Sequence, residues 1–300
     1  MVDVCLPGTG GMIPLENRWL TCCWVEYQGS AILIDCGEGT QIALKSAGCK
    51  LSHLDTLLIT HFHADHIAGL PGLLLSLGST GKTIPLTIVG PKGLNQVVSA
   101  LTIIAPSLPY PLHLYEIKEN KEGSFEKDGT VVSFLPLSHW IPCFGYSITV
   151  RRKPIFNPEK ANALGVPVTL FKRLHEGNRV QLENGRTVRP EEVLDGERDP
   201  IRVCYCTDTQ PLDSIADFAK NADLLISEGM YGDDTMRDKT QEKGHMLFSD
   251  SAEIARKAGA KRLWLTHFSP ALTNPDLYAG AAQKIFPSAA VAHDGMRITL

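Results

Sequence analysis

The chemistry of this chain is decided by residues 57–69, which read LLITHFHADHIAG. The apolar start of this stretch predicts a buried strand of a parallel or mixed sheet. Alternation in the extended loop that follows points His61 and His63 the same way. Asp65 and His66 then fall in the first turn of a helix and are directed back to the same point. Four polar side chains are therefore expected to converge at the end of one strand.

Imidazole and carboxylate groups that meet in this way are typical ligands of Zn²⁺ or a similar transition-metal ion. The alternative is four unrelated polar residues in a surface loop, and their close spacing favours the metal site. One loop with four candidates could hold one zinc ion, although its geometry is poor for that purpose. A site for two ions needs further ligands from elsewhere in the chain.

Three more candidates occupy the same kind of position, just past an apolar strand. His139 follows VVSFLPLS, Asp208 follows IRVCYCT, and His267 follows RLWLT. A lone His or Asp at a strand end is more often a cap or a turn residue. Their shared position strengthens all three, because the carboxyl ends of parallel strands gather at one edge of a sheet. A carboxylate such as Asp208 can bridge two metal ions, which an imidazole cannot readily do.

The composition is that of an ordinary soluble globular protein, with 43% hydrophobic and 21% charged residues. No secretory signal is evident at the start, and the longest apolar run, near residues 70–77, is too short to span a membrane. The eight cysteines form no C-x-x-C pair, so we expect a reducing, cytoplasmic location. The net charge of −4 gives no general attraction to nucleic acid, so such a partner requires a local basic patch.

Strand-like and helix-like segments alternate along the chain in two halves of similar pattern. This alternation predicts an α/β (α+β) fold of two sheets covered on their outer faces by helices, a four-layer αββα sandwich. All 300 residues are expected to form a single domain. The last segment, AAVAHDGMRITL, is expected to have strand character with a turn at His293-Asp294.

Residues 151–199 differ from the rest, with four prolines and weak periodicity, and are predicted to form an inserted, projecting arm. Between Arg151 and Arg189 nine basic residues face three acidic ones, a charge of +6 that leaves −10 for the rest of the chain. Extension of this window to Asp199 reduces its charge to +2. A basic projection on an acidic body favours binding of backbone phosphates. The alternative is a hairpin whose charges only keep it in solution.

The segment HFHADH, followed in order by His139, Asp208 and His267, resembles the metallo-β-lactamase superfamily of hydrolases. Within it the chain resembles the ribonuclease Z family, the endonucleases that remove the 3′ trailer of precursor tRNA. This closer resemblance is carried by DCGEGTQ (35–41), GLPGLL (69–74), VGPKG (89–93), SHWIPCFGY (138–146), TDT (207–209) and LTHFS (265–269).

The resemblance implies two metal ions, zinc by preference with manganese or iron as alternatives. It assigns three ligands to each ion and one bridging residue, in the order His61, His63 and His139; Asp65, His66 and His267; and Asp208. Two cations about 3.5–4 Å apart lower the pKa of a bridging water and stabilise the attacking and leaving oxygens of a phosphoryl displacement. The attacking group would then be a metal-bridging hydroxide.

Three further residues are expected to support this chemistry. Asp65 is placed to take a proton from the water. Glu228 and His245 match a pair that assists the leaving group in the family. Asp35, in DCGEGT, is expected to orient a ligating histidine rather than to bind metal itself. The resemblance also implies a homodimer in which the arm of one subunit serves the active site of the other.

Three functions therefore remain open. The leading one is a zinc-dependent endoribonuclease that trims precursor tRNA. The second is a metallohydrolase of the same superfamily that acts on a small phosphodiester or other ester, with the arm as a lid or dimer contact. The third, a binding protein without catalysis, is disfavoured because the ligand set is intact. Departures from the family pattern, such as an arm without its Gly-Pro turn, concern substrate handling and touch no proposed ligand.

Overall fold

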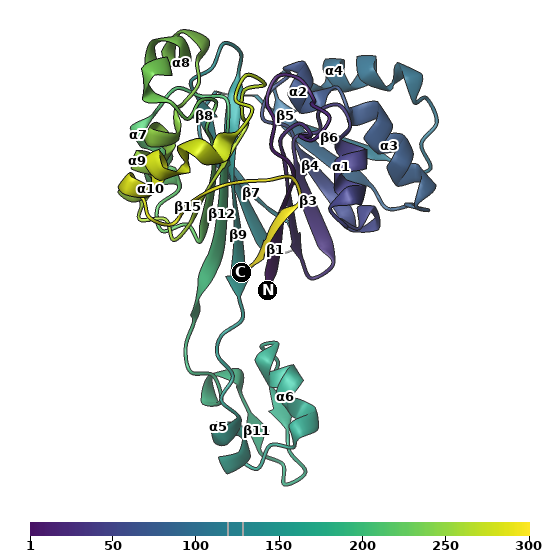
Figure 1. The fold of residues 1–300 in the computed structure, drawn as a ribbon. Helices are drawn as coiled ribbons and strands as arrows, with labels where there is room; N and C mark the ends of the chain where they lie inside the picture. The colour runs from purple at the N-terminus through teal and green to yellow at the C-terminus, as the bar shows by residue number, and fades with distance from the viewer. Residues whose placement is uncertain (119, 128) are drawn as a thin grey trace.

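Two β-sheets face each other in this protein, with helices on both outer sides and an arm that extends from one end (Figure 1). The computed structural model describes residues 1–118, 120–127 and 129–300. The four-layer αββα arrangement predicted from the alternation of strands and helices is confirmed. Both sheets have seven strands.

The first sheet is built from the N-terminal part of the chain and one strand from the C-terminal end. Its strands are β1 (Val2–Gly8), β2 (Cys22–Tyr27), β3 (Ser30–Ile34), β4 (Leu54–Leu58), β5 (Leu86–Pro91), β6 (Leu112–Ile117) and β16 (Met296–Thr299). Their order is β16-β1-β2-β3-β4-β5-β6, and β3 to β6 run parallel. The ends of β3 and β4 therefore lie together at one edge of the sheet.

The second sheet repeats this arrangement. Its strands are β7 (Gly123–Lys127), β8 (Thr130–Leu137), β9 (Cys143–Arg152), β12 (Arg198–Cys206), β13 (Leu224–Glu228), β14 (Leu263–Thr266) and β15 (Ala289–Val291). They follow the order β15-β14-β13-β12-β9-β8-β7, with β12 to β15 parallel. Three neighbouring strands, β12, β13 and β14, thus present their carboxyl ends at a common edge.

Helices cover the outer face of each sheet. Those of the N-terminal half are α1 (Thr40–Ser46), α2 (Ala64–Ile67), α3 (Leu70–Ser79) and α4 (Leu94–Leu101), with short 3₁₀ turns η1 (Leu51–His53) and η2 (Thr102–Ile104). Those of the C-terminal half are α7 (Asp213–Phe218), α8 (Arg237–Lys243), α9 (Phe248–Ala258) and α10 (Ala279–Ile285), with η4 (Asp234–Met236) and η5 (Pro275–Tyr278). No helix among the described residues is long and apolar enough to cross a membrane.

Apolar side chains fill the three spaces between the four layers. The central core packs the inner faces of both sheets and includes Val4, Ile34, Tyr146 and Ile226. Two outer cores join each sheet to its helices, with Leu33 and Leu73 in one and Leu225 and Ala255 in the other. Strands buried on both faces explain why these segments are continuously apolar in the sequence rather than alternating.

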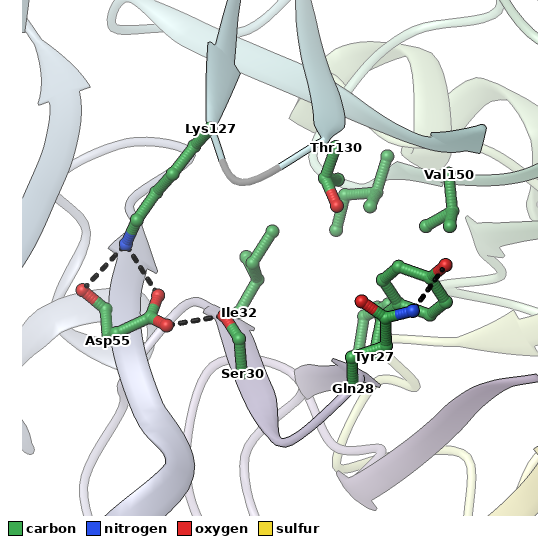
Figure 2. Close-up of a pocket in the computed structure, with 10 residues that line it drawn as sticks. Tyr27, Gln28, Ser30, Ile32, Asp55, Lys127, Thr130 and Val150 are labelled. Atoms are coloured by element: carbon green, nitrogen blue, oxygen red, sulfur yellow. Dashed lines mark hydrogen bonds and ion pairs between the residues drawn. The ribbon is translucent and has the colours of Figure 1, made fainter. Parts of the chain in front are cut away.

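The two sheets are joined by polar contacts as well as by the core. At the site end, the Phe144 amide donates to the Thr60 carbonyl oxygen at 3.0 Å. At the opposite end, Lys127 of the second sheet reaches Asp55 of β4, with 2.6 Å between Nζ and Oδ1, beside a small cavity (Figure 2). The Ser30 hydroxyl also donates to Asp55. These contacts fix how one sheet lies on the other.

The last segment of the chain has strand character, as expected, but it is divided between the two sheets. β15 joins the second sheet, and β16 crosses to pair with β1 of the first. The crossing occurs at the predicted turn, where Gly295 adopts a φ of 82°. The periodicity of a sequence does not indicate which sheet a strand will join, so this division was not foreseen.

The arm is more ordered than its weak periodicity suggested. It contains α5 (Pro158–Ala163), α6 (Val168–His175), the hairpin β10 (Val180–Gln181) and β11 (Thr187–Val188), and the turn η3 (Pro190–Glu192). These short elements enclose an apolar cluster of their own that includes Leu174, Val180 and Val188. The arm leaves the body where β9 ends and β12 begins, so it lies at the far end of those strands (Figure 1).

The contact between the two sheets can be tested at the buried hydroxyl group of Tyr146. This hydroxyl donates to the Ile59 carbonyl oxygen at 2.8 Å, two residues before His61. We expect Tyr146→Phe to lower the free energy of unfolding by about 0.5–1.5 kcal/mol, the net worth of one hydrogen bond. The measurement is urea denaturation. The matched control is Tyr115→Phe, at a tyrosine that is 59% exposed, with an expected change below about 0.5 kcal/mol. Equal stability of both variants would contradict the role of this bond.

Candidate metal centre

The seven ligand candidates converge where the carboxyl ends of the two sheets meet. His61 and His63 follow β4, and Asp65 and His66 lie in α2, the helical turn expected there. On the second sheet, the remaining three each follow a strand, with β8 before His139, β12 before Asp208 and β14 before His267. The structure therefore brings together residues that are up to about 200 positions apart, as His66 and His267 are.

Three histidines form the first group. His61 Nε2 lies 3.0 Å from His63 Nδ1, which in turn lies 3.2 Å from His139 Nε2. The predicted alternation, which points His61 and His63 the same way, accounts for the first of these distances. All three ligand atoms lie within 4.8 Å of one another, close enough to contact one cation.

The second group combines Asp65, His66 and His267. The Nε2 atoms of the two histidines are 3.3 Å apart. Asp65 Oδ2 lies 3.4 Å from His66 Nε2 and 3.5 Å from His267 Nε2. This group draws two members from the loop after β4 and one from the opposite sheet.

Asp208 lies between the two groups and faces both. Its Oδ1 is 3.9 Å from His61 Nε2 and 4.0 Å from His139 Nε2. Its Oδ2 is 3.2 Å from His66 Nε2 and 3.3 Å from His267 Nε2. One carboxylate oxygen therefore belongs to each group, which is the geometry of a bridging ligand.

These distances fit cation binding. Ligand atoms about 2.0–2.1 Å from a tetrahedral ion lie about 3.3–3.4 Å from one another, close to the separations within both groups. Asp208 Oδ2 is buried yet accepts no hydrogen bond from the described residues. An ionised oxygen is costly to bury without a donor or a cation. The donor set of imidazoles and carboxylates is that of zinc and similar metals.

The protonation states of His61, His139 and Asp208 suit metal binding, whereas at His66, against the effect of burial, Asp208 and Asp35 raise the pKa well above its usual value. Burial, followed by the neighbouring His66, holds the pKa of His61 well below its usual value. Burial likewise lowers the pKa of His139 to about 4. Burial raises the pKa of Asp208, but its neighbours His267, His66 and His61 outweigh that effect and hold it well below the usual range. Neutral imidazoles and an ionised carboxylate are the forms that ligate a metal ion.

Asp35, in DCGEGT, bonds the ring nitrogen of His66 that faces away from the other ligands, and so orients this histidine as expected. Its Oδ2 lies 2.7 Å from His66 Nδ1. The amide of Thr60 donates to Oδ1 at 2.8 Å, and the Thr60 hydroxyl also bonds this carboxylate. Asp35 is fully buried and has a φ of 64°, and Asp208 and His267 have similar positive φ values of 59° and 60°. Such backbone conformations gather at functional sites, where packing maintains them.

Two glycines let the DCGEGT segment pack onto the metal loop. A Cβ atom at Gly69 would lie 1.9 Å from the Gly37 carbonyl oxygen, and one at Gly37 would lie 2.0 Å from the Asp65 carbonyl oxygen. The Gly69 amide donates to the Cys36 carbonyl oxygen at 2.9 Å, and the Cys36 amide to that of His66 at 2.8 Å. Any side chain at either glycine would separate Asp35 from His66.

Glu228 and His245 form a pair beside the metal ligands. Glu228 Oε2 lies 2.8 Å from His245 Nδ1, while Oε1 accepts from the Thr209 amide at 2.6 Å. Burial lowers the pKa of His245, but the Glu228 carboxylate overrides this and raises it to about 9. The ring of His245 lies 5.6 Å from that of His267 between centroids. The pair therefore lies within the site, beside the metal ligands.

Several residues at the mouth of the site were not singled out from the sequence. A cavity of about 230 Å³ is lined by several of the metal ligands and also by Met12, Trp140, Met230, Tyr231 and Lys243. The Met12 amide donates to Asp65 Oδ2 at 2.7 Å. These residues come from three loops and the end of α8, so no local pattern marks them as one group. The exception is Trp140, whose position directly after His139 was a usable signal.

The other four histidines lie outside the groups of side chains that form this site. Among the described residues none belongs to a group able to hold a metal ion. They are His53, His113, His175 and His293.

Comparisons with known proteins agree with this geometry. Two family profiles match parts of the chain: "Anti-Pycsar protein Apyc1" over residues 2–96 and "Beta-lactamase superfamily domain" over residues 149–268. The chain is 48% identical to a ribonuclease Z of Agathobacter rectalis and 44% identical to one of Lachnospira eligens. Each alignment spans 300 residues, 100% of this chain and 98% of the relative.

A solved structure extends the likeness to the fold. Human tRNase Z, short form, superposes with a TM-score of 0.70 at 26% identity, over 99% of this chain and 98% of that one. The similarity thus covers both sheets, the arm and every residue of the metal centre. The chain belongs to the ribonuclease Z family, metal-dependent endoribonucleases with the metallo-β-lactamase fold.

Proposed function

We propose that this protein removes the 3′ trailer of precursor tRNA by hydrolysis of one phosphodiester bond. The observation that carries the proposal is the position of Asp208 between two ligand groups, next to the Glu228–His245 pair. Such a site suits in-line displacement at phosphorus, and the relatives named ribonuclease Z and tRNase Z point to tRNA as the substrate.

The metal ions of the proposed site are two zinc ions. One would be held by His61, His63 and His139 and the other by Asp65, His66 and His267, with Asp208 shared between them. When bound, the two ions supply Lewis-acid stabilisation of the charge that develops on the attacking and leaving oxygens. The fit of donor types and separations supports zinc over oxygen-seeking ions such as Mg²⁺.

Asp65 acts as the proton acceptor. Its Oδ2 atom faces the ligand groups, 3.4 Å from His66 Nε2 and 3.5 Å from His267 Nε2. The Met12 amide holds Oδ2 at 2.7 Å and fixes the orientation of the carboxylate. An ionised, oriented carboxylate can accept a proton from the attacking water.

His245 acts as the proton donor to the leaving oxygen. Because Nδ1 is bound to Glu228, Nε2 is the ring nitrogen left to carry a proton into the cavity. The Glu228 carboxylate stabilises the protonated ring and is itself held by the Thr209 amide. Glu228 therefore positions and charges His245 without touching the substrate.

The arm binds the phosphate backbone of the tRNA. Lys172 and Arg173 in α6 and Arg179 just after it are exposed, and no carboxylate of the described residues lies within 4.0 Å of them. Four other basic residues of the arm, Arg151, Lys153, Lys160 and Arg186, are already paired with carboxylates, as Lys160 is with Asp195 at 2.6 Å. Unpaired cations on a projection are those available to replace the counterions of a nucleic acid.

The arm and the metal site lie at opposite ends of the same strand. β12 begins at Arg198, beside the arm, and runs nine residues to Cys206, just before Asp208. A strand of that length spans about 30 Å. The arm therefore acts on parts of a long substrate far from its own active site, or on a substrate held by a second subunit.

The protein is proposed to form a homodimer through its N-terminal helical layer. The N-terminal helical layer exposes large apolar side chains on neighbouring elements, since α3 packs against both α1 and η2. These side chains are Ile42, Leu75, Ile103 and Ile104. Grouped apolar exposure of this kind marks protein interfaces.

The remaining proposals concern the whole chain. We treat residues 1–300 as one hydrolase domain with an inserted arm at about 151–199. All eight cysteines are free thiols in the structure, which supports a reducing, cytoplasmic setting. A small phosphodiester is the alternative substrate, because the cavity of about 230 Å³ could hold one without any help from the arm.

The substrate is tested with two phosphodiesters. Purified protein with zinc should cleave a 3′-extended tRNA precursor as well as bis(p-nitrophenyl) phosphate. Replacement of Lys172, Arg173 and Arg179 by Ala should raise KM for the precursor and leave the small ester unaffected. Each lost phosphate contact should also reduce the salt dependence of log KM by about 0.7–0.9.

The matched control replaces three lysines of the body, Lys220, Lys257 and Lys284, and should change neither reaction. Cleavage of the small ester alone would contradict the tRNA substrate. An equal effect of both triple variants would contradict the role of the arm.

The variant Asp35→Asn tests whether the carboxylate of Asp35 strengthens metal binding through His66. Loss of the carboxylate removes the charged partner of His66 Nδ1, and we expect zinc affinity to fall about 10- to 100-fold. Competition with a chromophoric chelator measures this. Asp55→Asn, a substitution at the opposite end of β4, should leave the affinity unchanged. Wild-type affinity in Asp35→Asn would refute the role.

The dimer is tested by Ile104→Lys, at a side chain that is 74% exposed. A charge at the centre of a buried apolar interface should convert the dimer to a monomer in sedimentation velocity at micromolar concentration. Leu277→Lys, at a similarly exposed leucine of the other helical layer, should remain dimeric. A monomeric wild-type protein would contradict the proposal.

A further inference from the structure

An exposed tryptophan stands at the mouth of the metal site, where the hydrolytic chemistry gives it no role. The Trp140 side chain is 71% exposed, although it directly follows His139 and lines the same cavity as the metal ligands. The other three tryptophans of the chain are buried or partly buried. A large apolar ring left in water beside a reaction centre is placed to be covered by a substrate.

The ring is held in position rather than free to turn. Trp140 Nε1 donates to the Lys243 carbonyl oxygen at 2.9 Å, at the end of α8. Gly244 follows with a φ of 71°, and a Cβ atom there would lie 3.3 Å from both Trp140 Nε1 and His139 Nδ1. Glycine therefore lets the backbone approach both rings. An aromatic ring fixed in this way loses little conformational freedom when a ligand covers its face.

A lysine lines the same cavity as this ring. This residue, Lys243, is exposed, and no carboxylate of the described residues lies within 4.0 Å of its ammonium group. An aromatic face together with a free ammonium group is the combination that binds one nucleotide, by stacking on the base and by charge on the phosphate. The reacting phosphate must lie a few ångströms away, at the metal ligands.

We propose that Trp140 is a substrate-binding residue on which the base of a nucleotide adjoining the scissile phosphate stacks, with Lys243 at the phosphate next to it. The inference rests on the proposed function, because it requires a nucleic-acid substrate. It goes beyond that function by naming the group that anchors the substrate at the point of cleavage. Within one subunit the arm lies at the far end of β12 from the metal site, so Trp140 and the arm make separate contacts with the substrate.

The test is a cycle of protein and substrate changes. Trp140→Ala should raise KM for a 3′-extended tRNA precursor about 5- to 150-fold, equivalent to the 1–3 kcal/mol of about one stacked base. The value of kcat should change little, because the metal centre is intact. Trp140→Phe, which keeps a stacking face, should restore most of the affinity. Zinc content and thermal unfolding of both variants should match the wild type.

The substrate side uses precursors with a single abasic nucleotide on the 5′ or the 3′ side of the scissile bond. For the wild type, one of the two should show the same rise in KM as Trp140→Ala shows with the intact precursor. Trp140→Ala should show no further rise with that abasic precursor, because the two changes remove one contact. This result also identifies which nucleotide stacks.

The outcomes separate this inference from the proposed function. If the wild type cleaves the precursor but Trp140→Ala has an unchanged KM, the stacking role is overturned and the function stands. Additive effects of the variant and both abasic precursors would likewise overturn it. If the wild type cleaves no precursor, the proposed function fails and the stacking role fails with it. Leu277→Ala, at a side chain 76% exposed and outside the cavity, should behave as the wild type throughout.

Discussion

The structure depends on one carboxylate, that of Asp208, which lies between imidazoles carried by two different sheets. Its two oxygens face separate groups of histidines at 3.2–4.0 Å. An arrangement of that kind survives only if the sheets cannot slide on each other. The contacts of Tyr146 with Ile59, and of Phe144 with Thr60, provide that restraint within a few residues of the cluster.

The same carboxylate explains why the centre needs so many buried supports. His66 lies between Asp35 and Asp208, with 2.7 Å to one and 3.2 Å to the other. A row of charges in a dry interior is costly unless each is oriented and paired. The backbone amides of Thr60, Thr209 and Met12 meet this need by donating to Asp35, Glu228 and Asp65. Part of the site is thus made of main chain, which any sequence can supply.

The side-chain ligands of the site could be predicted from the sequence, because each follows a recognisable local pattern. HFHADH is local, so its spacing alone predicted that His61 and His63 would converge. His139, Asp208 and His267 were found because each follows an apolar strand, and strand ends share an edge. Local patterns say nothing about contacts made across the fold.

The features that were not predicted depend on such contacts. The Met12 amide reaches Asp65 from another loop, and the fixed ring of Trp140 depends on the end of α8. The arm was recognised by its prolines and charge, but its apolar cluster, which includes Leu174 and Val188, was not. That cluster is built from elements too short to show a periodicity.

The pairing of β1 with β16 has a consequence for synthesis. Residue 2 and residue 300 exchange two backbone hydrogen bonds, Val2 to Leu300 at 3.0 Å and the reverse at 2.8 Å. On the ribosome, β1 emerges with one edge open and keeps it open until residues 296–299 have left the tunnel. Contacts of such long range form late and slowly. The first sheet, although encoded almost entirely in the first half of the chain, is therefore among the last parts of the molecule to be completed.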